Sequence, residues 1–91
     1  MGDIADWRDR IDKVDSKMLE LLNERARCAC EIGNIKAQNS MDVYNPARER
    51  EIMSKLSELN EGPLSDNSIQ AIYEKIIEEC RTLEKSENEC D

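Results

Sequence analysis

Apolar residues recur every seven positions along the first part of the chain, in two interleaved rows. The first row is Ile4, Ile11, Met18 and Ile32, and the second is Trp7, Val14, Leu21, Cys28 and Ile35. A heptad repeat of this length is typical of a long helix that packs lengthwise against other helices. The first row is interrupted at Arg25. Because a buried seam does not accept an unpartnered charge, Arg25 either breaks the pattern or faces an anion.

The pattern predicts a first helix from about Ile4 to about Asn39, with Asp3 as N-cap. Gly33 is its weak point, because glycine inside a helix costs about 1 kcal/mol relative to alanine. Either the helix ends there or another segment approaches its backbone closely. Residues 35–37 keep the register, so we expect the helix to continue.

Two shorter helices follow a polar connection. Asn45 and Pro46 are a favourable N-cap and N1 pair for the second helix, and Gly62 is the expected C′ residue after it. Ser65 or Asp66 should cap the third helix. Its apolar stripe consists of Ile69, Ile72, Tyr73, Ile76, Ile77, Cys80 and Leu83.

Composition agrees with an all-α fold in a single domain. The chain has 91 residues, of which 37% are charged and 3% aromatic, with no His or Phe. We expect residues 1–91 to form one helical domain, with a core at about 6–84 and a frayed tail at 85–91. A net charge of −8 argues against nucleic acid or an anionic membrane as partner.

Cysteine usage and the N-terminal residues favour a cytoplasmic protein. No secretory signal and no apolar run of membrane-spanning length are visible. The four cysteines are Cys28, Cys30, Cys80 and Cys90. Cys28 and Cys30 face different sides of a helix, and no histidine is present to complete a zinc site. We therefore expect reduced thiols and no bound metal.

The length of the first helix predicts a homodimer. About 36 residues at about 1.5 Å each give a rod of roughly 54 Å. A compact chain of this size has a diameter of only about 30 Å. The rod would protrude with apolar residues uncovered, and a second copy is the simplest cover.

The candidate functional residues are charges placed on or beside the apolar stripes. Arg25 and Lys36 are almost three turns apart and so face nearly the same way, and Arg8 borders the same seam. Taken alone, Arg8 and Lys36 are more often snorkelling edge residues. Arg25 is harder to explain structurally, because its row is otherwise apolar.

Other candidates lie on the second and third helices. Arg48 and Glu49 fall in the first turn after Pro46, and Cys80 and Glu84 are i,i+4 partners. Arg48 could be part of a solvated face, Cys80 a small core residue and Glu84 the first residue of a fraying end. Taken together, cations on apolar-facing positions of an acidic chain suit a small anion with more than one carboxylate. No nucleophile with a base and no phosphate loop is visible, so an enzyme built this way would act by shape and electrostatics.

Several motifs in combination carry a resemblance to a known family. They are Trp-Arg-Asp-Arg-Ile-Asp-Lys-Val-Asp at 7–15, Leu-Leu-Asn-Glu-Arg at 21–25, Glu-Ile-Gly-Asn-Ile-Lys at 31–36, Asn-Pro-Ala-Arg-Glu-Arg-Glu at 45–51 and Ile-Ile-Glu-Glu-Cys-Arg at 76–81. In this combination the chain closely resembles the all-helical chorismate mutases, from about Asp6 to Glu84. The resemblance implies a three-helix protomer whose long first helices intertwine in a homodimer with two shared active sites. It also implies rearrangement of chorismate to prephenate without a cofactor, a step of the shikimate pathway toward phenylalanine and tyrosine.

The resemblance assigns a role to several positions. Arg8 would reach from the partner chain to one substrate carboxylate, and Arg25 would hold the other from its own chain. Lys36 would donate to the ether oxygen of the breaking bond, with Glu84 in the second position beside that oxygen. Glu49 would accept from the substrate hydroxyl.

The resemblance also places Arg48 close to the pocket and shows two departures from the family pattern. Cys80 stands where the family often has Ser, and a thiol is a poorer hydrogen-bond donor. Asn45 stands where many members have Asp. Glu84 stands where Gln is common in the family, although Glu also occurs there. An ionised Glu84 cannot donate to the ether oxygen, so it would have to be protonated.

Two alternatives remain open at the level of sequence. The same scaffold could eliminate pyruvate from isochorismate, as an isochorismate pyruvate lyase does. The chain could also be a non-catalytic dimeric helical interaction module. No separate effector domain is evident, so we expect no feedback control by an aromatic amino acid.

Overall fold

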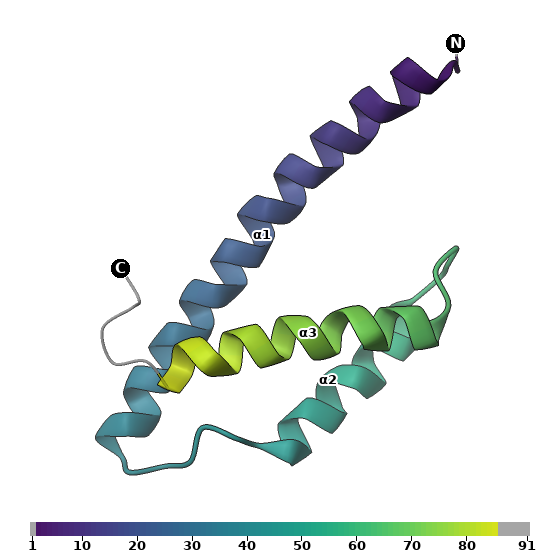
Figure 1. Ribbon diagram of the computed structural model, residues 1–91. Helices are drawn as coiled ribbons and strands as arrows, with labels where there is room; N and C mark the ends of the chain where they lie inside the picture. Colours follow the sequence, from purple (N-terminus) through teal and green to yellow (C-terminus); the bar gives the residue numbers. More distant parts are fainter. Residues whose placement is uncertain (1, 86–91) are drawn as a thin grey trace.

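Three helices make up the computed structural model, which describes residues 2–85 (Figure 1). They are α1 (Ile4–Gln38), α2 (Pro46–Leu59) and α3 (Asp66–Lys85), and no strand occurs among the described residues. The all-α class and the three-helix protomer with a long first helix are confirmed. Helix α3 continues through Lys85, and the rest of the predicted frayed tail lies outside the described residues.

Local capping sets the start of each helix as the sequence predicted. The Asp3 carboxylate accepts a hydrogen bond from the Asp6 amide at 3.0 Å, and the Asn45 side chain accepts one from the Arg48 amide at 3.1 Å. The Ser65 hydroxyl accepts from the Ser68 amide at 3.1 Å and so caps α3. Each cap satisfies an amide that has no partner within its helix.

The end of α2 differs from the prediction. Helix α2 ends at Leu59 with Asn60 as C-cap in an extended conformation, so Gly62 is not C′. Gly62 lies farther along, in the turn, with φ of +78°. The Asn60 side chain explains the difference, because its amide group donates to the Leu64 carbonyl at 2.9 Å and to the Asp66 carboxylate at 2.8 Å. Asn60 thereby closes the connection to α3, and glycine is used inside the turn.

Gly33 allows close packing of α3 on α1. The helix continues through this buried glycine, as predicted. A Cβ atom there would lie 2.7 Å from the Glu84 carbonyl oxygen and 2.8 Å from the Glu84 Cα. Gly33 is therefore required where the backbone of α3 meets α1.

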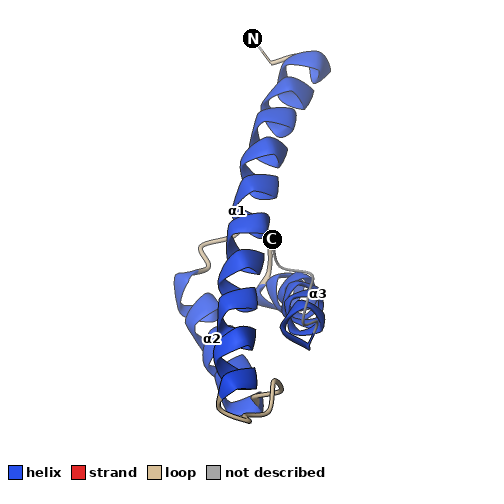
Figure 2. Ribbon diagram, turned by 90° about the vertical axis from the view of Figure 1, so that its left-hand side faces the viewer, coloured by secondary structure: helices blue, strands red, loops and turns tan. Residues whose placement is uncertain are grey.

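Helix α3 packs on both other helices and carries half of the small core. The buried apolar residues among those described are Ala29 and Cys30 of α1 and Ile77 and Cys80 of α3. The two α1 residues of this core lie in the C-terminal half of that helix, and the N-terminal half extends beyond α2 and α3 (Figures 1 and 2). The chain measures 55 × 29 × 15 Å, with a radius of gyration of 16.2 Å. A compact chain of this length would have a radius near 12 Å.

The protruding part of α1 leaves a continuous apolar row uncovered. We define the α1 seam as Ile4, Trp7, Ile11, Val14, Met18 and Leu21, each at least half exposed. Large contiguous apolar surfaces of this kind mark interaction sites.

Two further expectations can be compared with the described residues. Cys28 and Cys80 carry free thiols, but Cys30 is disulfide-bonded, so the expectation of reduced thiols is wrong at Cys30. Helical spacing excludes only a bridge between Cys28 and Cys30, and these two residues differ in burial, with Cys28 exposed and Cys30 buried. Cys90 lies outside the described residues. Within residues 2–85, no helix is long and apolar enough to cross a membrane, and no cluster of potential ligands could hold a metal ion.

Candidate active site

A cavity of about 240 Å³ lies where α1, α2, α3 and the 39–45 connection meet. Six of the seven predicted site residues line it, namely Arg25, Lys36, Arg48, Glu49, Cys80 and Glu84. These residues are far apart in sequence, so packing of the three helices brings them together.

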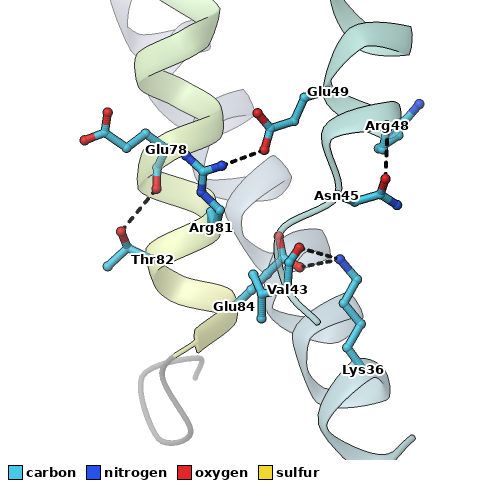
Figure 3. A network of polar contacts seen from close by, with 9 residues as sticks. All are labelled: Lys36, Val43, Asn45, Arg48, Glu49, Glu78, Arg81, Thr82 and Glu84. Carbon is cyan, nitrogen blue, oxygen red and sulfur yellow. Dashed lines mark hydrogen bonds and ion pairs between the residues drawn. The ribbon is translucent and has the colours of Figure 1, made fainter. Parts of the chain in front are cut away.

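Lys36 and Glu84 form a mostly buried ion pair at one side of the cavity (Figure 3). The Lys36 ammonium lies 3.3 Å from Oε1 of Glu84 and donates to the Val43 carbonyl at 2.9 Å, and both paired side chains are 15% exposed. A lysine ammonium has three N–H donors. One donor is therefore left to bind a group inside the cavity.

Arg25 is half-buried and lines the cavity, yet it has no hydrogen-bond or ion-pair partner within residues 2–85. A guanidinium in such a position presents a planar set of donors that fits a carboxylate. The interruption of the apolar row thus corresponds to a cation available at the cavity.

Glu49 has a partner that the sequence interpretation missed. Nη1 of Arg81 lies 2.7 Å from Oε2 of Glu49 (Figure 3). The Arg81 guanidinium also lies 5.0 Å from the centre of the Tyr44 ring. Arg81 also lines the cavity. A signal for it existed, because Arg81 is one residue after Cys80 and one turn before Glu84.

The other two predicted site residues that line the cavity, Cys80 and Arg48, differ in burial. Cys80 is buried at 7% exposure, with a free thiol. Arg48 is exposed at the cavity margin, where its guanidinium pairs with Glu51 while its amide is held by Asn45. Asn45 also lines the cavity and thus serves both the α2 cap and the site.

Arg8 is the predicted site residue that the fold of a single chain does not bring to the cavity. It is exposed on the protruding part of α1, 17 residues before Arg25. At the rise of an α-helix this separation is about 26 Å. Arg8 of the same chain cannot contact a molecule held by Arg25.

The cavity is locally positive in an acidic protein. Four cationic side chains and two carboxylates line it, an excess of two positive charges, whereas the whole chain carries −8. The Arg25 guanidinium and the remaining donor of Lys36 can together bind and orient a dicarboxylate.

The sequence of the chain matches a known protein family over nearly its whole length. The family model described as chorismate mutase type II matches residues 7–85. The chain belongs to the type II chorismate mutase family. The recognition made from sequence motifs is thereby confirmed, and the match spans all of the cavity residues.

Individual members of the chorismate mutase family are similar to this chain in sequence. The chain is 31% identical to the chorismate mutase of Methanocaldococcus jannaschii over 83 residues, covering 90% of this chain and 84% of that protein. It is 39% identical to the bifunctional chorismate mutase/prephenate dehydratase of Aquifex aeolicus over 89 residues, which is 93% of this chain. The chain spans only about a quarter of the length of that bifunctional relative (25%).

A solved structure of the family has the same fold. The chorismate mutase (Form II) of Thermus thermophilus superposes with a TM-score of 0.91 at 31% identity. The match covers 94% of this chain and 98% of that one. The arrangement of α1, α2 and α3 is therefore the fold of a known chorismate mutase.

Proposed function

We propose that the chain is a chorismate mutase, which rearranges chorismate to prephenate in the cavity around Arg25 and Lys36. The observation that carries this proposal is the excess of positive charge in a small cavity, formed by Arg25, Lys36, Arg48 and Arg81. Membership of the family supports it. A place in aromatic amino acid biosynthesis and a cytoplasmic location are further parts of this proposal.

The reaction asks little covalent chemistry of the protein. Within one molecule a C–O bond breaks and a C–C bond forms, and no proton or electron has to be exchanged with the protein. The rate then depends on holding the reactive conformer and on stabilising charge that grows on the ether oxygen. No metal or cofactor is required for such a step.

Arg25, Lys36 and Glu84 would perform the central roles. Arg25 binds one carboxylate of the substrate through its guanidinium, which has no partner within residues 2–85. The remaining N–H of Lys36 donates to the ether oxygen, because its other two donors are directed to Val43 and Glu84. Glu84 of α3 would donate to the same oxygen only in its protonated form.

The α2 side of the cavity would hold the rest of the substrate. Glu49 accepts a hydrogen bond from the substrate hydroxyl, and Arg48 lies near enough to the cavity to attract the dianion. The Cys80 thiol contacts the substrate at the cavity wall as a weak donor.

A second copy of the chain would complete the site. The α1 seam is exposed, and Arg8 lies beside it at a distance of about 26 Å from Arg25 along the helix. In a homodimer with intertwined α1 helices, the seams cover each other and Arg8 of each chain binds the second carboxylate in the other chain's cavity. Sedimentation of the purified protein measures the dimer directly.

The deciding experiment is an optical assay of chorismate consumption with identification of the product. Prephenate as product supports the proposal. Pyruvate released from isochorismate, with no turnover of chorismate, would instead identify a lyase. Absence of turnover of either substrate by a folded dimer would leave the non-catalytic module as the function.

A further inference from the structure

Arg81 has a place in the cavity that none of the predicted roles uses. It lies on α3, next to Cys80, with its side chain 27% exposed. Its guanidinium joins the Glu49 carboxylate, which is 29% exposed, at 2.7 Å (Figure 3). Within residues 2–85, this is the one ion pair between α2 and α3.

Tyr44 holds the guanidinium from the other side. The guanidinium carbon lies 5.0 Å from the Tyr44 ring centre, in the connection that leads to α2. A planar guanidinium can contact a ring with its face and donate from its edge at the same time. Arg81 is thus fixed between the 39–45 connection and the first turn of α2.

This arrangement restrains the side chain of Glu49 and leaves one of its carboxylate oxygens available. A carboxylate has two oxygens with about four acceptor positions. Arg81 engages Oε2, which leaves Oε1 with full capacity to accept a hydrogen bond. An unrestrained glutamate loses rotamer freedom when it binds, and a glutamate that Arg81 already holds loses less.

We propose that Arg81 is a positioning residue, which holds the Glu49 carboxylate so that its second oxygen accepts the substrate hydroxyl. The inference rests on the proposed function, because it needs a substrate with a hydroxyl in this cavity. Arg81 acts through Glu49 and not by its own contact with the substrate.

A double-mutant cycle on chorismate turnover tests this role. Arg81→Met removes the charge and keeps the length of the side chain, and Glu49→Gln removes the carboxylate charge. We expect Arg81→Met to lower kcat/KM about tenfold, as loss of a charge-assisted hydrogen bond does. In the Glu49→Gln background the same change should have almost no further effect, since the two residues act as a unit.

Two control variants separate the role of Arg81 from a general loss of positive charge or of stability. Arg50→Met removes a cation from α2 that does not line the cavity and should leave kcat/KM unchanged. Arg81→Lys retains the charge and should recover part of the activity, and it serves as the test variant if Arg81→Met does not fold. Thermal unfolding of each variant measures stability independently.

The outcomes distinguish the inference from the proposed function. No chorismate turnover by the unmodified protein would overturn the proposed function and, with it, the role of Arg81. Turnover by the unmodified protein combined with losses that multiply in the double variant would overturn the role of Arg81 alone, since Arg81 would then act independently of Glu49. Unchanged activity of Arg81→Met would overturn it as well.

Discussion

Arg25 is singled out both by the sequence pattern and by its position at the cavity. It interrupts an apolar row, lines the cavity and has no ion-pair partner among the described residues. Arg25→Ala should therefore lower kcat/KM by a hundredfold or more, roughly the cost of losing a buried charge-assisted contact. The fold should persist with unchanged or higher stability, because an unpaired cation leaves a partly apolar site.

Arg27→Ala is the matched control for this variant. Arg27 is exposed on α1 and does not line the cavity, so its removal should leave turnover unchanged. Steady-state kinetics and thermal unfolding of both variants make the comparison. Full activity of Arg25→Ala would contradict its assignment to a substrate carboxylate.

Glu84 is expected to be the second donor at the ether oxygen. An ionised carboxylate accepts hydrogen bonds but cannot donate one, so only the protonated form can bind the ether oxygen as a donor. Glu84→Gln places an amide donor at the same position whatever the protonation state, so it should retain or raise kcat/KM. Steady-state kinetics of this variant measure the effect, and a large loss of kcat/KM would contradict the role of Glu84 as a donor.

At the scale of residues, the sequence identified cations on apolar faces but not the ion pairs that they form. Arg25 and Lys36 were predictable because helical spacing alone places both on one face. Arg81 was missed because it lies beside the apolar stripe and its partners, Glu49 and Tyr44, come from other segments. Arg81 comes to line the cavity only because α3 packs against α2, and no local sequence pattern specifies that packing.

At the scale of elements, Gly33 couples the packing of α1 to the position of Glu84. Gly33→Ala places a methyl group within 2.7 Å of the Glu84 carbonyl oxygen, and a backbone atom cannot rotate away. Overpacking of this kind costs about 1–3 kcal/mol, and the helix preference of alanine offsets about 1 kcal/mol of it. We expect a net destabilisation of about 1 kcal/mol and a loss of kcat of about tenfold, because Glu84 moves relative to Lys36.

Asn34→Ala is the control for Gly33→Ala. Asn34 is the next residue of α1 and is exposed, so alanine there should be neutral or slightly stabilising, with normal kcat. Thermal unfolding and kinetics of both variants provide the measurement. Gly33→Ala with normal kcat and stability would show that α3 can shift without cost, contrary to the close contact.

Helix starts were predictable and one helix end was not, for a physical reason. Asp3, Asn45 and Ser65 cap their helices through hydrogen bonds to an amide three residues on, which depend on local sequence only. The end of α2 depends on Asn60, whose side chain bonds to residues of the following turn and of α3. Gly62 was a correct signal for a turn but not for the position of the helix end.

At the scale of the whole molecule, the length of α1 determines how the site can be completed. The extent of 55 Å agrees with the rod of roughly 54 Å expected from the helical rise. The α1 seam is exposed over the same part of the helix that carries Arg8. In the proposed homodimer, the second chain that covers the seam would therefore also receive Arg8 in its cavity.

A mixing experiment tests whether the two chains share their sites. Arg8→Ala and Arg25→Ala homodimers should each be nearly inactive, because every site lacks one carboxylate contact. When they are unfolded together and refolded, about half of the dimers should contain one chain of each kind. In such a dimer one site has lost both arginines and the other has both, so activity should recover to about a quarter of the normal value.

The control mixes Arg25→Ala with Lys36→Ala. Both residues line the cavity of their own chain, so every site of the mixed dimer still lacks one of them and activity should not recover. Recovery in the first mixture and not in the second requires that Arg8 crosses between chains while Arg25 and Lys36 do not. Recovery in neither mixture would place Arg8 outside the site. The long first helix would then cover apolar surface without contributing to binding of the substrate.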